Sequence, residues 1–123
     1  MLPHSQAPHF AYIGDSILGH HVNLGAGTKL SNVPITKGYI RGVKSDENVG
    51  LTLDGCVYDT GTRKLGAILG DEVQTGCNSV LNPGTLIGPR TLVYPNAVLA
   101  RGFYPGGSII KLRQQLEIVE RNY

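Results

Sequence analysis

The chain contains no tryptophan, one methionine, two phenylalanines and only two cysteines among its 123 residues. The lack of tryptophan and the presence of only two phenylalanines argue against a large aromatic core. Cys56 and Cys77 are too few for a disulfide framework and lack the spacing of a zinc site. The longest apolar runs are only a few residues, so neither a membrane span nor a signal peptide is expected. These absences predict a cytoplasmic protein with reduced cysteines.

The charge pattern is also weak. The net charge is +2, and acidic and basic residues are interspersed, so no basic surface indicates a nucleic-acid partner. The length predicts one domain. Seventeen glycines and seven prolines indicate a chain rich in turns.

What is present is a six-residue period over residues 65–103. Counting in sixes, the leading positions are Leu69, Thr75, Leu81, Ile87, Val93 and Leu99. The fifth positions are Val73, Ser79, Thr85, Thr91 and Ala97. This period fits neither a helix nor an alternating strand, and self-similarity marks a repeat architecture. It predicts an all-β fold, a single-stranded parallel β-helix with the leading residue pointing inward and coils about 4.8 Å apart. A set of ordinary hairpins is the alternative.

The rest of the chain is divided around this repeat. Residues 1–8 are expected to be an extended lead-in, and residues 9–104 a β-helix domain interrupted by an insertion at 31–64. In the insertion, GYIRGVK (38–44) and VGLTLDGCVY (49–58) each look like a short strand, with SDEN (45–48) as the turn. Long structured insertions in a solenoid often form a site or a subunit contact; a tolerated excursion is the alternative.

Residues 105–123 have a helical pattern. Ser108 is a candidate N-cap, and Ile109, Leu112, Leu116 and Val119 recur at helical spacing. We expect a C-terminal helix that caps the last coil. A partner-binding helix is the other interpretation.

Four histidines are candidates for chemistry. His9 opens the first coil beside Tyr12, and a histidine can accept a proton from an attacking amine. A hydrogen-bonded structural role for His9 is the alternative. No group of Cys, His and Asp has the spacing of a metal site within the chain, although His4 and His9 would permit ligands shared between subunits. Asn23 and Asn32 place amide side chains in the repeat, which can hydrogen-bond either to neighbouring backbone groups or to a ligand.

Two stretches carry a family resemblance: HFAYIGDSILGHHVNLGAGTKLSN (9–32) and DTGTRKLGAILGDEVQTGCNSVLNPGTLIGPRTLVYPNAVL (59–99). They resemble the left-handed β-helix acetyltransferase domain of sugar-1-phosphate nucleotidylyltransferases, the enzymes that make UDP-N-acetylglucosamine. The resemblance covers about residues 8–104, and the H-x-x-Y-x-G-D, N-x-G-A-G-T and L-G-x-I-x-G-D motifs are specific to it. It implies a left-handed helix and an N-acetyltransferase that uses acetyl-CoA on a hexosamine-1-phosphate.

The resemblance also implies roles for individual residues. His9 matches the general base, and Tyr12, Asn23 and Asn32 match residues that contact the sugar phosphate or orient the reacting groups. Lys37 is the nearest match to a phosphate-binding lysine. The positions of Cys77 and Pro95 match the groove for the pantetheine of acetyl-CoA, and no metal is expected.

The resemblance further implies a homotrimer with sites between subunits. It does not extend to the nucleotidyltransferase domain, because no part of the 123 residues resembles one. Two other functions therefore stay open. One is a non-catalytic trimerisation or regulatory module associated with a separate nucleotidyltransferase chain. The other is a metal-dependent lyase of the carbonic-anhydrase type.

Overall fold

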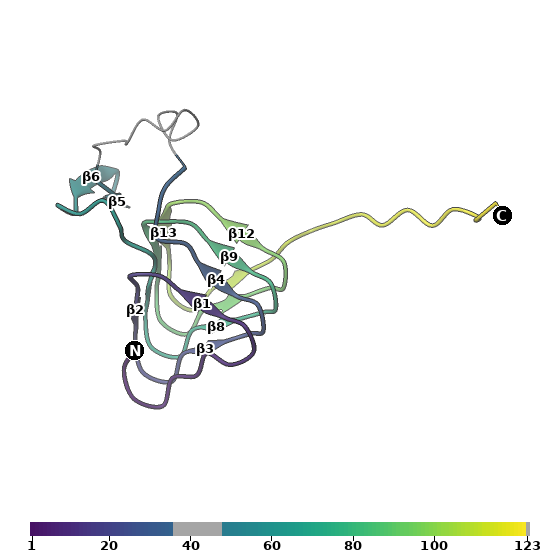
Figure 1. Cartoon of the computed structure of the whole chain (residues 1–123), viewed down its shortest axis with the longest axis horizontal. Coiled ribbons are helices and arrows are strands. Elements are labelled where there is room, and N and C mark those ends of the chain that lie inside the picture. Colours follow the sequence, from purple (N-terminus) through teal and green to yellow (C-terminus); the bar gives the residue numbers. More distant parts are fainter. Residues whose placement is uncertain (36–47, 123) are drawn as a thin grey trace.

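A computed structural model describes residues 1–35 and 48–122, which form fourteen strands (Figure 1). Twelve of them build three parallel four-stranded sheets. Sheet I contains β1 (Tyr12–Ile13), β4 (Lys29–Leu30), β9 (Val80–Leu81) and β12 (Val98–Leu99). Sheet II contains β2 (Ile17–Leu18), β7 (Ile68–Leu69), β10 (Thr85–Ile87) and β13 (Gly102–Tyr104). Sheet III contains β3 (Asn23–Leu24), β8 (Gln74–Thr75), β11 (Leu92–Val93) and β14 (Ile109–Ile110).

The chain visits the three sheets in turn and stacks one coil on the next. In sheet I, Leu81 pairs with Leu99, and in sheet II Leu69 pairs with Ile87; each pair is 18 residues apart, which is three sixes. Every leading and fifth position of the predicted repeat is buried. The predicted fold, a left-handed parallel β-helix of hexapeptide repeats, is therefore confirmed.

Each sheet passes to the next through a tight corner. Many corner residues have a positive φ, among them Glu72 (61°) and Arg90 (55°) between sheets II and III, and Asn78 (57°) and Asn96 (63°) between sheets III and I. Asparagine tolerates this left-handed conformation better than most residues. The same conformation recurs coil after coil, so corner side chains at equivalent positions lie above one another.

The insertion leaves and rejoins the solenoid at the corner between sheets I and II. Leu30 pairs with Leu81, although 51 residues separate them, which is 33 more than one coil of 18. The insertion contains an antiparallel hairpin of β5 (Gly50–Leu53) and β6 (Cys56–Asp59), which projects beside the stack (Figure 1). The prediction of one strand over 49–58 is wrong, because Asp54 and Gly55, with φ of 51° and 76°, turn the chain back within it. The other predicted strand, 38–44, lies outside the described residues.

The C-terminal helix predicted over 105–123 is also wrong. Ile109 and Ile110 form β14 against β11, and the Ser108 hydroxyl donates to the carbonyl of Pro105 (2.6 Å) and caps no helix. Residues 111–122 have no regular secondary structure and extend away from the stack (Figure 1). A helix of about a dozen residues is marginal in water without a packing partner, and here Leu116 (80%) and Val119 (71%) are exposed. Among the residues described, no helix is long and apolar enough to cross a bilayer.

Candidate functional site

One corner of the solenoid carries three of the seven predicted site residues, namely His9, Cys77 and Pro95. This corner lies between sheets III and I, and we call it the His9 corner. Four successive coils contribute residues 9–10, 26–27, 77–78 and 95–96 to it. Backbone hydrogen bonds join its coils: Gly27 N to His9 O (2.9 Å), Asn78 N to Ala26 O (2.8 Å) and Asn96 N to Cys77 O (3.0 Å). Residues distant in sequence therefore form one continuous strip along the edge of the stack.

The strip brings His9 together with both predicted cofactor-binding residues. Cys77 and Pro95 are exposed on it, and Ala26 lies between them and His9. Small side chains leave the backbone open along this edge, and the N–H of Ala26 has no acceptor among the described residues. Such a strip suits an extended ligand that lies along the backbone.

His9 is exposed and stands at the N-terminal end of this strip with a φ of 57°. Among the described residues its imidazole makes no hydrogen bond, so both ring nitrogens are open to solvent or substrate. Asn23 is exposed on the neighbouring sheet III, paired with Gln74 in β8 and bridged to Gln6. The structure places Asn23 three residues before Ala26 of the His9 corner and shows no hydrogen bond between Asn23 and His9.

Tyr12 and Asn32 meet at the opposite edge of sheet I. The Tyr12 hydroxyl donates to Asn32 Oδ1 (3.2 Å), and Asn32 Nδ2 donates to Asp15 Oδ2 (2.6 Å). Gly14 makes this packing feasible, because a Cβ there would collide with the Asn32 side chain at 2.5–2.8 Å. Asp15 thereby fixes the orientation of the amide, and the amide orients the phenol.

Lys29 is a cation that the sequence reasoning missed. It pairs with Tyr12 in sheet I, is exposed, and its ammonium donates to the carbonyl of Gly27 at the His9 corner (2.7 Å). It therefore lies on the outer face of sheet I, beside Tyr12 and next to the His9 corner. The sequence alone does not mark this lysine out, because an exposed lysine in a strand is common and only the pairing with Tyr12 on the neighbouring coil places it at the site.

The remaining candidates contribute less. Lys37 lies outside the described residues. His4 and His21 stack with ring centroids 4.9 Å apart and planes at 11°, at the corner between sheets II and III rather than near His9. In the part of the chain that the structure describes, no three His, Cys, Asp or Glu side chains are arranged to hold a metal ion.

No protein-family model matches this chain. It is 37% identical over 97 residues to a bifunctional sugar-1-phosphate nucleotidylyltransferase/acetyltransferase of Sulfurisphaera tokodaii, covering 79% of this chain and 22% of that protein. It is 30% identical over 122 residues to the bifunctional protein GlmU of Methanococcus vannielii, covering 99% of this chain and 27% of that protein. The chain thus spans about a quarter of the length of these relatives.

Among solved structures, serine acetyltransferase 1 of Entamoeba histolytica is similar, with a TM-score of 0.53 and 13% identity over 80% of this chain and 30% of that one. At this identity the likeness shows the fold alone. The sequence relatives confirm the predicted resemblance to sugar-1-phosphate nucleotidylyltransferase/acetyltransferases.

Proposed function

We propose that this chain is an acetyl-CoA-dependent N-acetyltransferase domain that acts on the amine of a hexosamine-1-phosphate in nucleotide-sugar synthesis. The observation that carries the proposal is the His9 corner, where His9, Cys77 and Pro95 share one exposed strip. The similarity to the sugar-1-phosphate nucleotidylyltransferase/acetyltransferase of S. tokodaii supports the same chemistry.

The residues present fit acetyl-CoA as co-substrate. Ala26, Cys77 and Pro95 would line the pantetheine, since their small side chains leave the edge of the backbone open. The unpaired N–H of Ala26 would donate to the oxygen of the thioester carbonyl as negative charge develops there. Acetyl-CoA supplies the acyl group.

His9 acts as the general base. As the amine nitrogen of the acceptor bonds to the carbonyl carbon, His9 takes the proton that the nitrogen loses; the C–S bond then breaks, and the departing thiolate takes that proton from the His9 imidazolium. Holding amine and thioester together supplies a larger part of the rate than the base does. Asn23 on one side of the corner, with Tyr12 and Asn32 on the other, would position the sugar, and Lys29 would attract its phosphate.

Self-association forms part of the proposal. The outward side chains of sheet II are all apolar: Ile17, Ile68, Leu86 and Phe103. Ile17 is 56% and Phe103 51% exposed in the single chain. A short solenoid gains burial by packing such a flat face against copies of itself, and we propose a homotrimer in the cytoplasm.

The apolar face of sheet II also supports a second candidate, a non-catalytic trimerisation or regulatory module for a separate nucleotidyltransferase chain. Thiol release from acetyl-CoA in the presence of glucosamine-1-phosphate separates the two. We expect release by the wild type and a loss of about 10²–10⁴-fold in His9→Ala, with His20→Ala, an exposed histidine at another corner, unchanged.

Undiminished release by His9→Ala removes His9 from the mechanism. A wild type that forms trimers by light scattering, releases no thiol and shows no rise in melting temperature with acetyl-CoA favours the non-catalytic module.

A further inference from the structure

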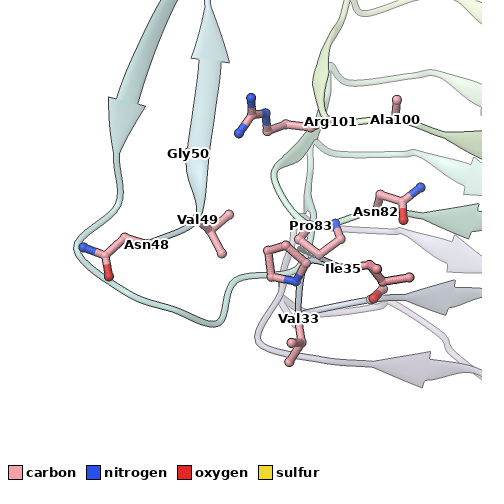
Figure 2. A pocket seen from close by; sticks show the side chains of 11 residues that line it. Val33, Ile35, Asn48, Val49, Gly50, Asn82, Pro83, Ala100 and Arg101 are labelled. Atoms are coloured by element: carbon pink, nitrogen blue, oxygen red, sulfur yellow. The ribbon is translucent and has the colours of Figure 1, made fainter. Parts of the chain in front are cut away.

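A hollow lies between the foot of the insertion hairpin and the corner between sheets I and II (Figure 2). Its volume is about 400 Å³, within the range of small-molecule sites. Val49, of which only 2% is exposed, lines it just before β5, Val33 lines it where the insertion begins, and Pro83 lines it from the coil. The hollow therefore has apolar walls from two segments far apart in the sequence.

Arg101 carries the positive charge of this hollow. Its stem passes between two glycines: a Cβ on Gly84 would lie 3.0 Å from Arg101 Cγ, and a Cβ on Gly50 would lie 3.2 Å from Arg101 Nη1. Figure 2 shows the side chain reaching from the coil toward the hairpin. The two glycines thus leave the space that lets the arginine cross from coil to hairpin.

The guanidinium of Arg101 has no protein partner among the described residues: it makes no hydrogen bond and no ion pair there. A guanidinium presents five donors in a planar fork that matches a carboxylate or phosphate. A fork held at the rim of a hollow without an acceptor of its own is suited to an anion from solution.

Two amides add directional groups. Asn82 lines the hollow, and its Nδ2 donates to the carbonyl of Leu99 (2.9 Å), which leaves its Oδ1 as a fixed acceptor. Asn48 lines the hairpin side and is exposed. One cation, two amides and apolar walls make up the pattern of a site for a small molecule with an anionic end and an apolar body.

We propose that this hollow binds a small organic anion, with Arg101 gripping its phosphate or carboxylate and Val33, Val49 and Pro83 covering its apolar part. The hollow lies across sheet I from the His9 corner, and its lining shares no residue with the proposed acetyl-transfer site, although Ser31 and Val33 flank Asn32. A ligand here leaves His9 free, and its binding does not depend on acetyl transfer.

The test uses the full chain without acetyl-CoA. Phenyl phosphate is titrated by calorimetry, with benzoate as the carboxylate, inorganic phosphate as the anion without an apolar body, and benzyl alcohol as the uncharged body. We expect one of the two aromatic anions to bind more tightly than inorganic phosphate or benzyl alcohol, and the tighter one identifies the anionic group.

Arg101→Gln should lower the affinity for that aromatic anion at least tenfold, because charged hydrogen bonds are lost. The affinity of Arg101→Lys should lie between those of the wild type and Arg101→Gln, since lysine keeps the charge without the planar fork. Arg90→Gln, which removes an exposed arginine from another corner, should bind as the wild type does. Ala100→Leu should also block binding without changing the charge, because Ala100 lines the hollow.

Three results would overturn the proposal: no binding of either aromatic anion at millimolar concentration, equal losses in the Arg101→Gln and Arg90→Gln variants, or a change of assembly state in Arg101→Gln by light scattering with no ligand present. The last result would assign Arg101 to a contact between copies of the chain.

Discussion

Leu81→Ala removes an inward side chain from the middle of the stack. Leu81 is fully buried in sheet I, paired with Leu30 on one coil and Leu99 on the other. Backbone hydrogen bonds such as Val80 N to Ala97 O (2.9 Å) hold the coils at their spacing, so the cavity has little room to collapse. The three lost carbon atoms account for about 2.4 kcal/mol, and the cavity raises the total cost to about 3–4 kcal/mol.

For a chain of this size, that loss lowers the melting temperature by about 12–16 °C. The assay is thermal unfolding by circular dichroism at one fixed protein concentration, because assembly makes the melting temperature depend on concentration. Val98→Ala is the matched control: Val98 lies in β12 of the same sheet but points outward, 67% exposed, and should cost no more than about 0.5 kcal/mol. Equal losses in the two variants would refute the inward orientation of the leading residues.

Two further predictions concern alkaline pH and corner geometry. Burial raises the pKa of Tyr104 above 10.0, so the contribution of this group to stability is full below pH 10 and is lost as the pH rises through the folded pKa. The free energy of unfolding, measured with urea, should therefore fall more steeply above pH 10 in the wild type than in Tyr104→Phe. Parallel curves of the two proteins against pH would contradict this. Gly27 and Gly55 both have positive φ (72° and 76°), but a Cβ would meet Asn78 Oδ1 only at Gly27. In urea unfolding, Gly55→Ala should lower the free energy of unfolding by about 1–2 kcal/mol, and Gly27→Ala should lower it by measurably more. Equal losses would count against the stacking of Gly27 on Asn78 at the His9 corner.

The period of six predicted the coils because the same inward position recurs without a slip, and Leu69, Leu81 and Ile87 are buried as expected. It did not locate the end of the last coil. Ile109 and Leu112 also fit helical spacing, but pairing of Ile109 with Leu92 gains a neighbouring strand, whereas a helix in the tail would have had nothing to pack against.

The site was only partly predictable for a related reason. His9, Cys77 and Pro95 were named by resemblance, and their placement on one strip follows from the stacking of corners that are 17 or 18 residues apart or separated by the insertion. Lys29 was missed because an outward lysine in a strand carries no sequence signal until its coil neighbour Tyr12 is known. The Asp54–Gly55 turn was visible in the sequence as a hairpin signal and was misread as strand.

The most direct test of the central claim, that the strip along the His9 corner holds acetyl-CoA, uses the two free, exposed cysteines. Cys77 lies on the strip and Cys56 on the insertion hairpin, so Cys56 is an internal control. Both are alkylated with iodoacetamide, with and without acetyl-CoA, and the two rates are followed by mass spectrometry. The account predicts that acetyl-CoA slows alkylation of Cys77 and leaves Cys56 unchanged; equal rates at Cys77 with and without saturating acetyl-CoA would contradict it.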